Sequence, residues 1–292
     1  MPLDVGVIGL GNIGGGVARN LTAAGHNVVG YDIETSRIAA AGATPANDTG
    51  GVVAQSDLVM VAVASLGAYQ ETMAAIAASA QDGLVVGDLC TFPIVAKEAA
   101  RAELAGAGAT LLDCPVSGAR PQSQAGELAM MVSGDEAAFR RVEDALNAFC
   151  RSVHFVGEFG VSAKLKYAIN LMISIHNMTC AEGFLFAREA GIDLNLFADM
   201  VRDSAAHCRI FDIRAEKWIS GDYDDPTAEL AIQLKDKDII ADFATSMDCP
   251  TPMFNTTLPY YTAAASRGWT KKDAACILAV MEEMAGIPRG KV

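Results

Sequence analysis

Short apolar runs alternate with alanine-rich helical stretches along the first half of the chain. The runs are five to seven residues long and apolar almost throughout, which is typical of strands buried on both faces of a parallel sheet. This alternation predicts an α/β fold with a Rossmann-type doubly wound parallel sheet. Its strands are expected at residues 5–10, 27–31, 58–63, 84–89 and 110–116, and two more, at 128–133 and 152–156, flank a helix at 136–149.

The second half of the chain is predicted to be helical throughout. Residues 162–190 contain no proline and one glycine, and their apolar residues recur at steps of three and four, as in an amphipathic helix. A helix of about 28 residues would be about 42 Å long, with Ser162 able to cap its start and Gly191 able to end it. A Rossmann domain at residues 1–161 and an all-α domain at 162–292 are therefore expected, joined through this long helix. Further helices are expected near residues 194–204, 210–218, 227–246, 254–267 and 273–285.

The first strand runs directly into the glycine-rich sequence GLGNIG, and a helical stretch follows. In this context the first glycine permits a tight turn, the second lets a pyrophosphate approach the backbone, and the third lets helix and strand pack closely. The second strand ends in Asp32, whose carboxylate can accept hydrogen bonds from the adenosine ribose and repel a 2′-phosphate, so NAD is the expected cofactor. Arg37, five residues on, keeps NADP open as the alternative. The cofactor-binding residues predicted from the loop are Gly9, Gly11, Asn12, Ile13 and Gly14.

Charge and cysteine content narrow the classes of partner and compartment. The net charge of −13 argues against nucleic acid and anionic membranes as partners, and no apolar run reaches the roughly 18 residues of a membrane span. The seven cysteines are widely spaced and include no CxxC pair, which is typical of reduced thiols in the cytoplasm and not of a disulfide or zinc framework. The start of the chain lacks a basic n-region, so no signal peptide is expected. No metal site is expected.

A lysine and an asparagine stand near the start of the long helix. Lys166 and Asn170 are four residues apart and should therefore point the same way. A cation and a carboxamide on one face of an apolar helix suggest a working site. A solvated lysine beside an asparagine remains the alternative from this stretch alone.

Four segments together carry a family resemblance. They are GLGNIG, DCPVSGARPQSQAGEL at residues 113–128, GEFGVSAKLKYAIN at 157–170, and the lysine–aspartate pair at 235–236 within LKDKDIIADFA. In order and spacing they resemble the β-hydroxyacid dehydrogenases, a group akin to 6-phosphogluconate dehydrogenase that includes 3-hydroxyisobutyrate dehydrogenase and tartronate semialdehyde reductase. The resemblance covers essentially the whole chain.

The resemblance implies a role for each matching residue. Lys166 falls at the catalytic lysine and Asn170 at its partner asparagine, whereas Lys164, the competing register, has no asparagine four residues later. Asp113 is expected to hydrogen-bond locally and to do no chemistry. The substrate-binding residues would be Ser117, Gly118, Ala119, Arg120 and Lys235, and the residues bordering the cofactor would be Val63, Ala64, Thr91 and Lys235.

Four positions depart from the family pattern, and they leave the exact substrate open. Ala64 replaces a usual proline, Cys90 a usual serine, Ala119 the second glycine of a serine–glycine–glycine run, and Ile169 the first of two asparagines. None of these changes removes the lysine or the cofactor loop.

These observations predict an NAD-dependent oxidoreductase that interconverts a short-chain 3-hydroxy acid and its semialdehyde, with Lys166 as general acid and base. An imine reductase-like enzyme on the same fold and a non-catalytic nucleotide-sensing protein are the alternatives. The family association favours a homodimer or homotetramer.

Arg120 suggests a second anionic group on the substrate. It stands three residues after Ser117, and a guanidinium binds a planar oxyanion through two parallel hydrogen bonds. Alternatively, Arg120 pairs with a surface carboxylate such as Glu127 or is only solvated.

Overall fold

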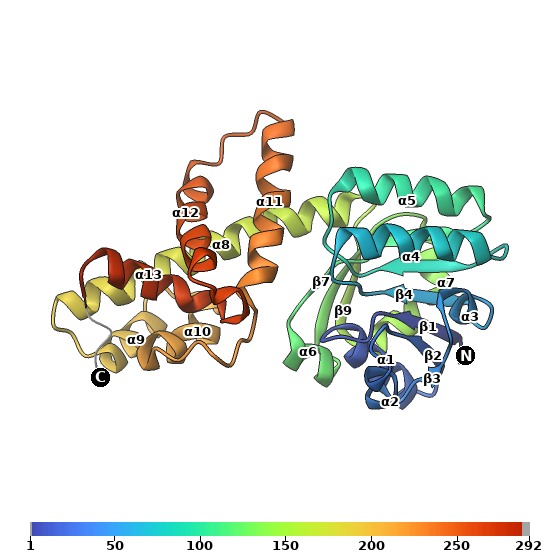
Figure 1. Cartoon of the computed structure of the whole chain (residues 1–292), viewed down its shortest axis with the longest axis horizontal. Coiled ribbons are helices and arrows are strands. Elements are labelled where there is room, and N and C mark those ends of the chain that lie inside the picture. Colours follow the sequence, from blue (N-terminus) through green and yellow to red (C-terminus); the bar gives the residue numbers. More distant parts are fainter. Residues whose placement is uncertain (1, 288–292) are drawn as a thin grey trace. The chain divides into compact units, whose positions relative to one another are not determined.

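The computed structural model describes residues 2–287 (Figure 1). The chain divides into two compact units, Met1–Lys166 and Tyr167–Val292. Among residues 2–287, no helix combines the length and the apolar character required to cross a membrane.

The first unit is built on a six-stranded parallel sheet with the strand order β3-β2-β1-β4-β5-β6. This is the order of a doubly wound dinucleotide-binding fold, so the predicted fold class is confirmed. The strands are β1 (Asp4–Ile8), β2 (Asn27–Tyr31), β3 (Thr44–Pro45), β4 (Leu58–Val61), β5 (Val85–Asp88) and β6 (Thr110–Asp113).

Both faces of this sheet are covered, because successive strand residues point to opposite sides. Val5 and Val7 of β1 belong to one apolar core and Ile8 to the other. In Figure 1, α4 and α5 lie over one face. The helices between the strands are α1 (Gly14–Ala23), α2 (Ser36–Ala41), α3 (Thr49–Val53), α4 (Leu66–Ser79) and α5 (Ile94–Gly106).

The strand predicted at residues 110–116 is in fact two strands in two sheets. β6 ends at Asp113, and β7 (Val116–Ser117) pairs antiparallel with β8 (Leu128–Val132), which pairs with β9 (Cys150–Phe155). Pro115 stands between the two strands and has no N–H to continue a ladder. Two helices complete this unit, α6 (Arg120–Ala125), which the sequence pattern did not reveal, and α7 (Glu136–Asn147).

The second unit is helical, as predicted, around a core that includes Phe184, Phe211, Trp218 and Tyr261. α8 (Val161–Glu189) enters it from the first unit, since the boundary between the units falls inside this helix. The others are α9 (Leu194–Arg202), α10 (Arg209–Ser220), α11 (Leu230–Ser246), α12 (Pro252–Ser266), the 3₁₀ turns η1 (Trp269–Lys271) and η2 (Ala274–Cys276), and α13 (Ile277–Met284).

Asp273 explains why two of these helices begin later than predicted. Its Oδ2 accepts hydrogen bonds from the backbone N–H groups of Thr227 and Ala228, at 2.8 and 3.2 Å. Its Oδ1 accepts one from the N–H of Ala275, at 2.9 Å. Both segments are thereby held as turns, so α11 begins at Leu230 and α13 at Ile277.

Candidate active site

The glycine loop between β1 and α1 has the shape that a pyrophosphate requires. Gly9 has φ +83°, and a Cβ there would lie 2.4 Å from the Ala62 carbonyl oxygen. A Cβ on Gly14 would lie 1.9 Å from the Gly9 oxygen, so these two positions exclude any side chain. At Gly11, by contrast, a Cβ would meet nothing within 4 Å. This open space at the start of a helix is where a dinucleotide phosphate fits.

Asp32 is buried at the end of β2 and is tied to the glycine loop. Its Oδ2 accepts a 2.7 Å hydrogen bond from the Leu10 N–H, and its Oδ1 accepts a 2.8 Å bond from the Glu34 N–H. Arg37 Nη1 lies 3.6 Å from Asp32 Oδ1, while its Nη2 pairs with Glu34 at 2.8 Å. The carboxylate expected to contact the ribose thus stands directly beside the arginine that could accept a 2′-phosphate.

The loops after β4 and β5, which carry Val63, Ala64 and Thr91, are joined by Cys90. Its thiol lies within hydrogen-bonding distance of the Val61 and Val63 carbonyl oxygens, at 3.5 and 3.6 Å. Burial, and then the neighbouring Asp88, raise the pKa of this thiol well above its ordinary value. Cys90 therefore links the two loops through its thiol contacts and does not serve as a nucleophile.

The Ser117–Gly118 turn leads into α6, which is docked on the start of α1. Gly118 has φ +137°, a conformation that favours glycine. The Ser123 hydroxyl donates to the Ile13 carbonyl at 2.8 Å, and the Asn20 amide donates to the Ser123 carbonyl at 2.9 Å. Ser123, which the sequence did not single out, thus links the predicted substrate loop to the glycine loop.

Ala119 and Arg120 stand at the start of α6. The Ala119 N–H donates to Gln122 Oε1 at 2.9 Å. Arg120 is exposed and makes no ion pair with any carboxylate in the described part of the chain, Glu127 included. Of the two alternatives to substrate binding, the pairing with Glu127 is not found, whereas the exposed guanidinium agrees with a solvated arginine.

The two lysines near the start of α8 differ in exposure. Lys166 is half-buried and Lys164 is exposed. α8 is continuous through Lys166 and Asn170, as predicted.

The start of α8 is anchored by Asp113, whose Oδ2 accepts a hydrogen bond from the Ala163 N–H at 2.8 Å. The hydroxyl of Ser162 donates to Asp113 and does not cap the helix. The expectation that Asp113 bonds only locally was wrong.

In the second unit, Asp236 brings together two of the predicted residues. Its Oδ2 accepts a hydrogen bond from the Asn170 amide at 2.8 Å, and its Oδ1 accepts one from Lys235 Nζ at 2.6 Å. Asp236 itself is buried. A carboxylate therefore orients both the asparagine and the lysine that the motifs predicted.

Two family models cover nearly the whole chain. Residues 4–157 match the NAD binding domain of 6-phosphogluconate dehydrogenase. Residues 160–281 match the NAD-binding domain of NADP-dependent 3-hydroxyisobutyrate dehydrogenase. The chain belongs to the β-hydroxyacid dehydrogenase family.

Individual relatives agree with this membership. The L-threonate dehydrogenase of Cupriavidus necator is 30% identical over 290 residues, with 96% of each chain covered. The crystal structure of a 3-hydroxyisobutyrate dehydrogenase from Salmonella typhimurium is 28% identical with a TM-score of 0.86, covering 94% of this chain and 99% of the other. A structure of Psf3 in complex with NADP+ and 2-OPP is 26% identical with a TM-score of 0.87, covering 95% and 99%. The protein is thus an oxidoreductase whose cofactor is NAD or NADP.

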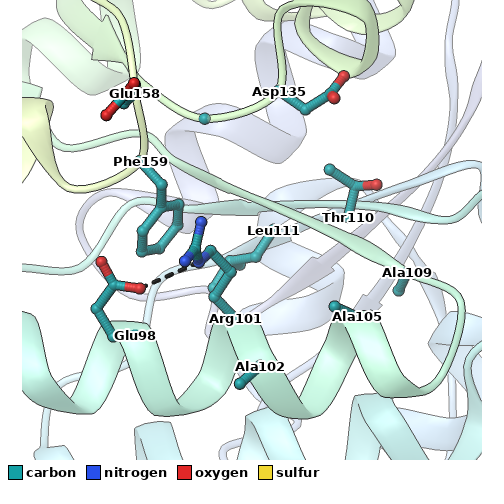
Figure 2. Close-up of a pocket in the computed structure, with 11 residues that line it drawn as sticks. Glu98, Arg101, Ala102, Ala105, Ala109, Thr110, Leu111, Asp135, Glu158 and Phe159 are labelled. Carbon is teal, nitrogen blue, oxygen red and sulfur yellow. Dashed lines mark ion pairs between the residues drawn. The ribbon is translucent and has the colours of Figure 1, made fainter.

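In this member of the β-hydroxyacid dehydrogenase family, a cavity of about 590 Å³ is lined mainly by residues of α5 and β6 (Figure 2). Within it, Arg101 pairs with Glu98 at 3.1 Å and lies 5.1 Å from the ring centroid of Phe159. None of the residues predicted for cofactor or substrate lines it. Its single arginine is already paired, so this cavity lacks the free cation that a hydroxy-acid carboxylate would need.

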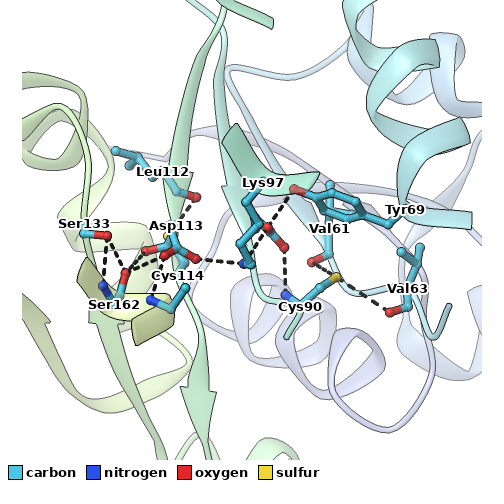
Figure 3. Close-up of polar contacts among 12 residues, drawn as sticks. Val61, Val63, Tyr69, Cys90, Lys97, Leu112, Asp113, Cys114, Ser133 and Ser162 are labelled. Atoms are coloured by element: carbon cyan, nitrogen blue, oxygen red, sulfur yellow. Dashed lines mark hydrogen bonds and ion pairs between the residues drawn. The ribbon is translucent and has the colours of Figure 1, made fainter. Parts of the chain in front are cut away.

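A cluster of buried charges lies at the ends of β5 and β6 (Figure 3). Lys97 Nζ stands 2.7 Å from Asp88 Oδ2 and 2.8 Å from Asp113 Oδ1, and all three side chains are buried. Burial opposes the charge on Lys97, but the two carboxylates outweigh it and raise the pKa of the ammonium. No pattern in the sequence indicated this cluster, because Lys97 lies in an alanine-rich helical stretch.

Proposed function

We propose that this enzyme oxidises the 3-hydroxyl group of a short hydroxy acid with NAD, and reduces the corresponding semialdehyde, with Lys166 as general base and acid. The observation that carries the proposal is the shared anchor at Asp113. Lys166 is three residues beyond Ala163, about 4.5 Å along the helix, and Ala163 is bonded to Asp113. Ser117 follows Asp113 by four residues, so the chain holds it within about 14 Å. One anchor thus supports both the lysine and the carboxylate-binding turn.

The chemistry follows from these positions. The glycine loop and Asp32 would hold a dinucleotide, which would supply the hydride acceptor for the carbinol carbon. The Ser117 hydroxyl and nearby backbone amides bind the substrate carboxylate, which fixes the distance from that carboxylate to the reacting carbon. The neutral amine of Lys166 takes the hydroxyl proton during oxidation, and its ammonium returns a proton to the carbonyl oxygen during reduction. Asn170, oriented by Asp236, donates a hydrogen bond from its amide to the substrate hydroxyl or the lysine.

A set of hydroxy acids of three to six carbons, bearing the hydroxyl at C2, C3 or C4, tests this assignment. We expect NADH formation with the 3-hydroxy acids, including 3-hydroxyisobutyrate, after which a relative is named. Turnover of 2- or 4-hydroxy acids alone would contradict the assignment, because the substrate carboxylate would then bind at a different distance from the reacting carbon. Binding of NAD without any turnover would favour a nucleotide-sensing protein.

NAD is the proposed cofactor in preference to NADP, because Asp32 is buried with its carboxylate fixed by two backbone N–H groups. Asp32→Ala should narrow the ratio of kcat/KM for NAD over NADP by about tenfold or more, since a 2′-phosphate would no longer meet a carboxylate. Arg37→Ala serves as the control and should lower kcat/KM for NADP more than kcat/KM for NAD. A wild-type enzyme that uses NADP as efficiently as NAD would contradict the assignment.

The exposed guanidinium of Arg120 supports a substrate with a second anionic group. Arg120→Ala should lower kcat/KM for a 3-hydroxy diacid by about fivefold and leave that for a monoacid of equal length nearly unchanged, because an exposed ion pair contributes only about 1 kcal/mol. Arg209→Ala, which removes an exposed arginine in the second unit, controls for net charge. Equal losses of kcat/KM for the diacid and the monoacid would mean that Arg120 only supports the loop and does not bind a second anionic group.

A cytoplasmic homodimer or homotetramer is the proposed state. The helices of the second unit expose large apolar side chains, including Phe186 (75% exposed), Met253 (62%) and Met200 (55%), as subunit interfaces require. Light scattering coupled to gel filtration tests this, and a monomer at micromolar concentration would contradict it.

A further inference from the structure

Each of the two carboxylates that bind Lys97 also holds a segment of the active site. Asp88 Oδ1 accepts a 2.8 Å hydrogen bond from the Cys90 N–H, and its Oδ2 accepts a 2.9 Å bond from the Tyr69 hydroxyl. Asp113 Oδ2 accepts a 2.8 Å bond from the Ala163 N–H. Figure 3 shows Lys97 between these two sets of contacts. A single ammonium therefore joins the loop that precedes Thr91 to the first turn of the helix that carries Lys166.

We infer that Lys97 is a positioning residue, which sets where Lys166 stands relative to the cofactor-side loop by fixing Asp113 and Asp88 together. This inference rests on the proposed function, because it presumes that Lys166 transfers the proton and that Thr91 borders the cofactor. None of the three charged groups needs to touch substrate or cofactor for this role.

Energetics favour positioning over stability as the role of this cluster. Removing charges from water costs free energy that their mutual attraction only partly repays, so a buried ion pair often stabilises a fold no better than apolar side chains would. What such a cluster does provide is fixed geometry, since each carboxylate oxygen binds a defined donor. Proton transfer and hydride transfer both depend on that geometry, and a displacement of about 1 Å can cost about 100-fold in rate.

The two arms of the cluster can be separated by isosteric substitutions. In Asp113→Asn, the amide oxygen should stay with the Lys97 ammonium, because a charged donor forms the stronger bond. The amide NH₂ group then faces the Ala163 N–H and the helix loses its acceptor. Asp88→Asn should release the Cys90 N–H in the same way. Each variant leaves Lys97 with one carboxylate, so the excess negative charge of the cluster disappears and the protein should fold.

The expected results differ between the two variants. Asp113→Asn should lower kcat about 10- to 100-fold and shift the pH dependence of kcat, because the surroundings of Lys166 change, while the Kd for NAD stays within twofold. Asp88→Asn should raise the Kd for NAD about fivefold or more and leave the pH dependence unchanged. Titration of NAD by fluorescence gives the Kd without turnover.

Asp135→Asn is the matched control, because Asp135 accepts a backbone hydrogen bond from Ala138 at the start of α7, a helix without predicted site residues. It should leave kcat, its pH dependence and the Kd unchanged. Should Asp113→Asn not fold, Asp113→Glu makes the same test, since it keeps the charge but displaces the anchor by one methylene.

Equal losses of kcat and affinity in Asp113→Asn and Asp88→Asn would mean that the cluster only stabilises the unit, and the inference would be wrong. Wild-type kcat in Asp113→Asn would also overturn it, provided that Lys166→Ala is inactive. Full activity in Lys166→Ala would instead remove the proposed function itself, so the two failures are distinguishable.

Discussion

Replacing Lys166 with alanine is expected to lower kcat by about 10²- to 10⁴-fold, the usual share of general acid–base catalysis, with NAD affinity nearly unchanged. The side chain is half-buried in the first turns of α8, within the unit that contains the glycine loop. Without its amine, no group named in the mechanism accepts the hydroxyl proton as hydride leaves. Steady-state rates with saturating NAD and hydroxy acid give the value.

Lys164→Ala is the matched control for this prediction. Lys164 carries the same charge in the same turn of α8, but it is exposed. We expect its removal to change kcat by less than about threefold. If the two variants exchanged behaviour, the register of the lysine motif would be wrong by two residues.

Replacing Lys237 with methionine is expected to stabilise the protein, although the side chain is buried. Lys237 lies in α11 at 2% exposure, and within residues 2–287 its Nζ has no hydrogen-bond partner. It lies against the ring of Tyr261. Burial, and then the nearby Arg214, lower the pKa of Lys237 from 10.5 to about 5. Methionine has a similar shape and no charge to desolvate.

The sign of the pH dependence follows from the lowered pKa. Between pH 5 and 10.5 the unfolded chain binds a proton at Lys237 that the folded chain does not, so the free energy of unfolding rises with pH by up to about 1.4 kcal/mol per unit. The destabilisation caused by burying Lys237 is absent above pH 10.5 and reaches its full size below pH 5. Lys237→Met should therefore raise the free energy of unfolding by about 2–4 kcal/mol at pH 7 and by little at pH 10.

Urea unfolding at both pH values measures this effect. Lys271→Met, at an exposed position of the same unit, is the control and should change stability by less than about 0.5 kcal/mol. A Lys237→Met protein less stable than the wild type at pH 7 would show that the ammonium has a favourable role in the fold.

Features determined by neighbouring residues were predictable from the sequence. The parallel sheet follows from short apolar strands, and the glycine loop from three glycines at fixed spacing, because turn geometry and strand burial are local properties. The continuous α8 follows from a long stretch without proline. The family motifs made Lys166, Asn170 and Lys235 candidate site residues by position alone, and their roles stay predictions.

Features determined by contacts far apart in the sequence were not predictable. The acceptor for the start of α8 is Asp113, which precedes Ala163 by 50 residues, whereas local spacing favoured Ser162. The run of charges at 235–238 is typical of a solvated face, yet Asp236 and Lys237 are buried. Burial of a charge depends on partners such as Asn170 that adjacent residues do not reveal.

The pH dependence of kcat in the wild type and in Lys166→Ala tests the central assignment most directly. If Lys166 is the base, kcat for hydroxy-acid oxidation falls in the wild type as its amine becomes protonated at low pH. That limb should be absent from Lys166→Ala, whose small residual rate would not titrate with the same midpoint. Survival of the same limb in Lys166→Ala would show that another group transfers the proton.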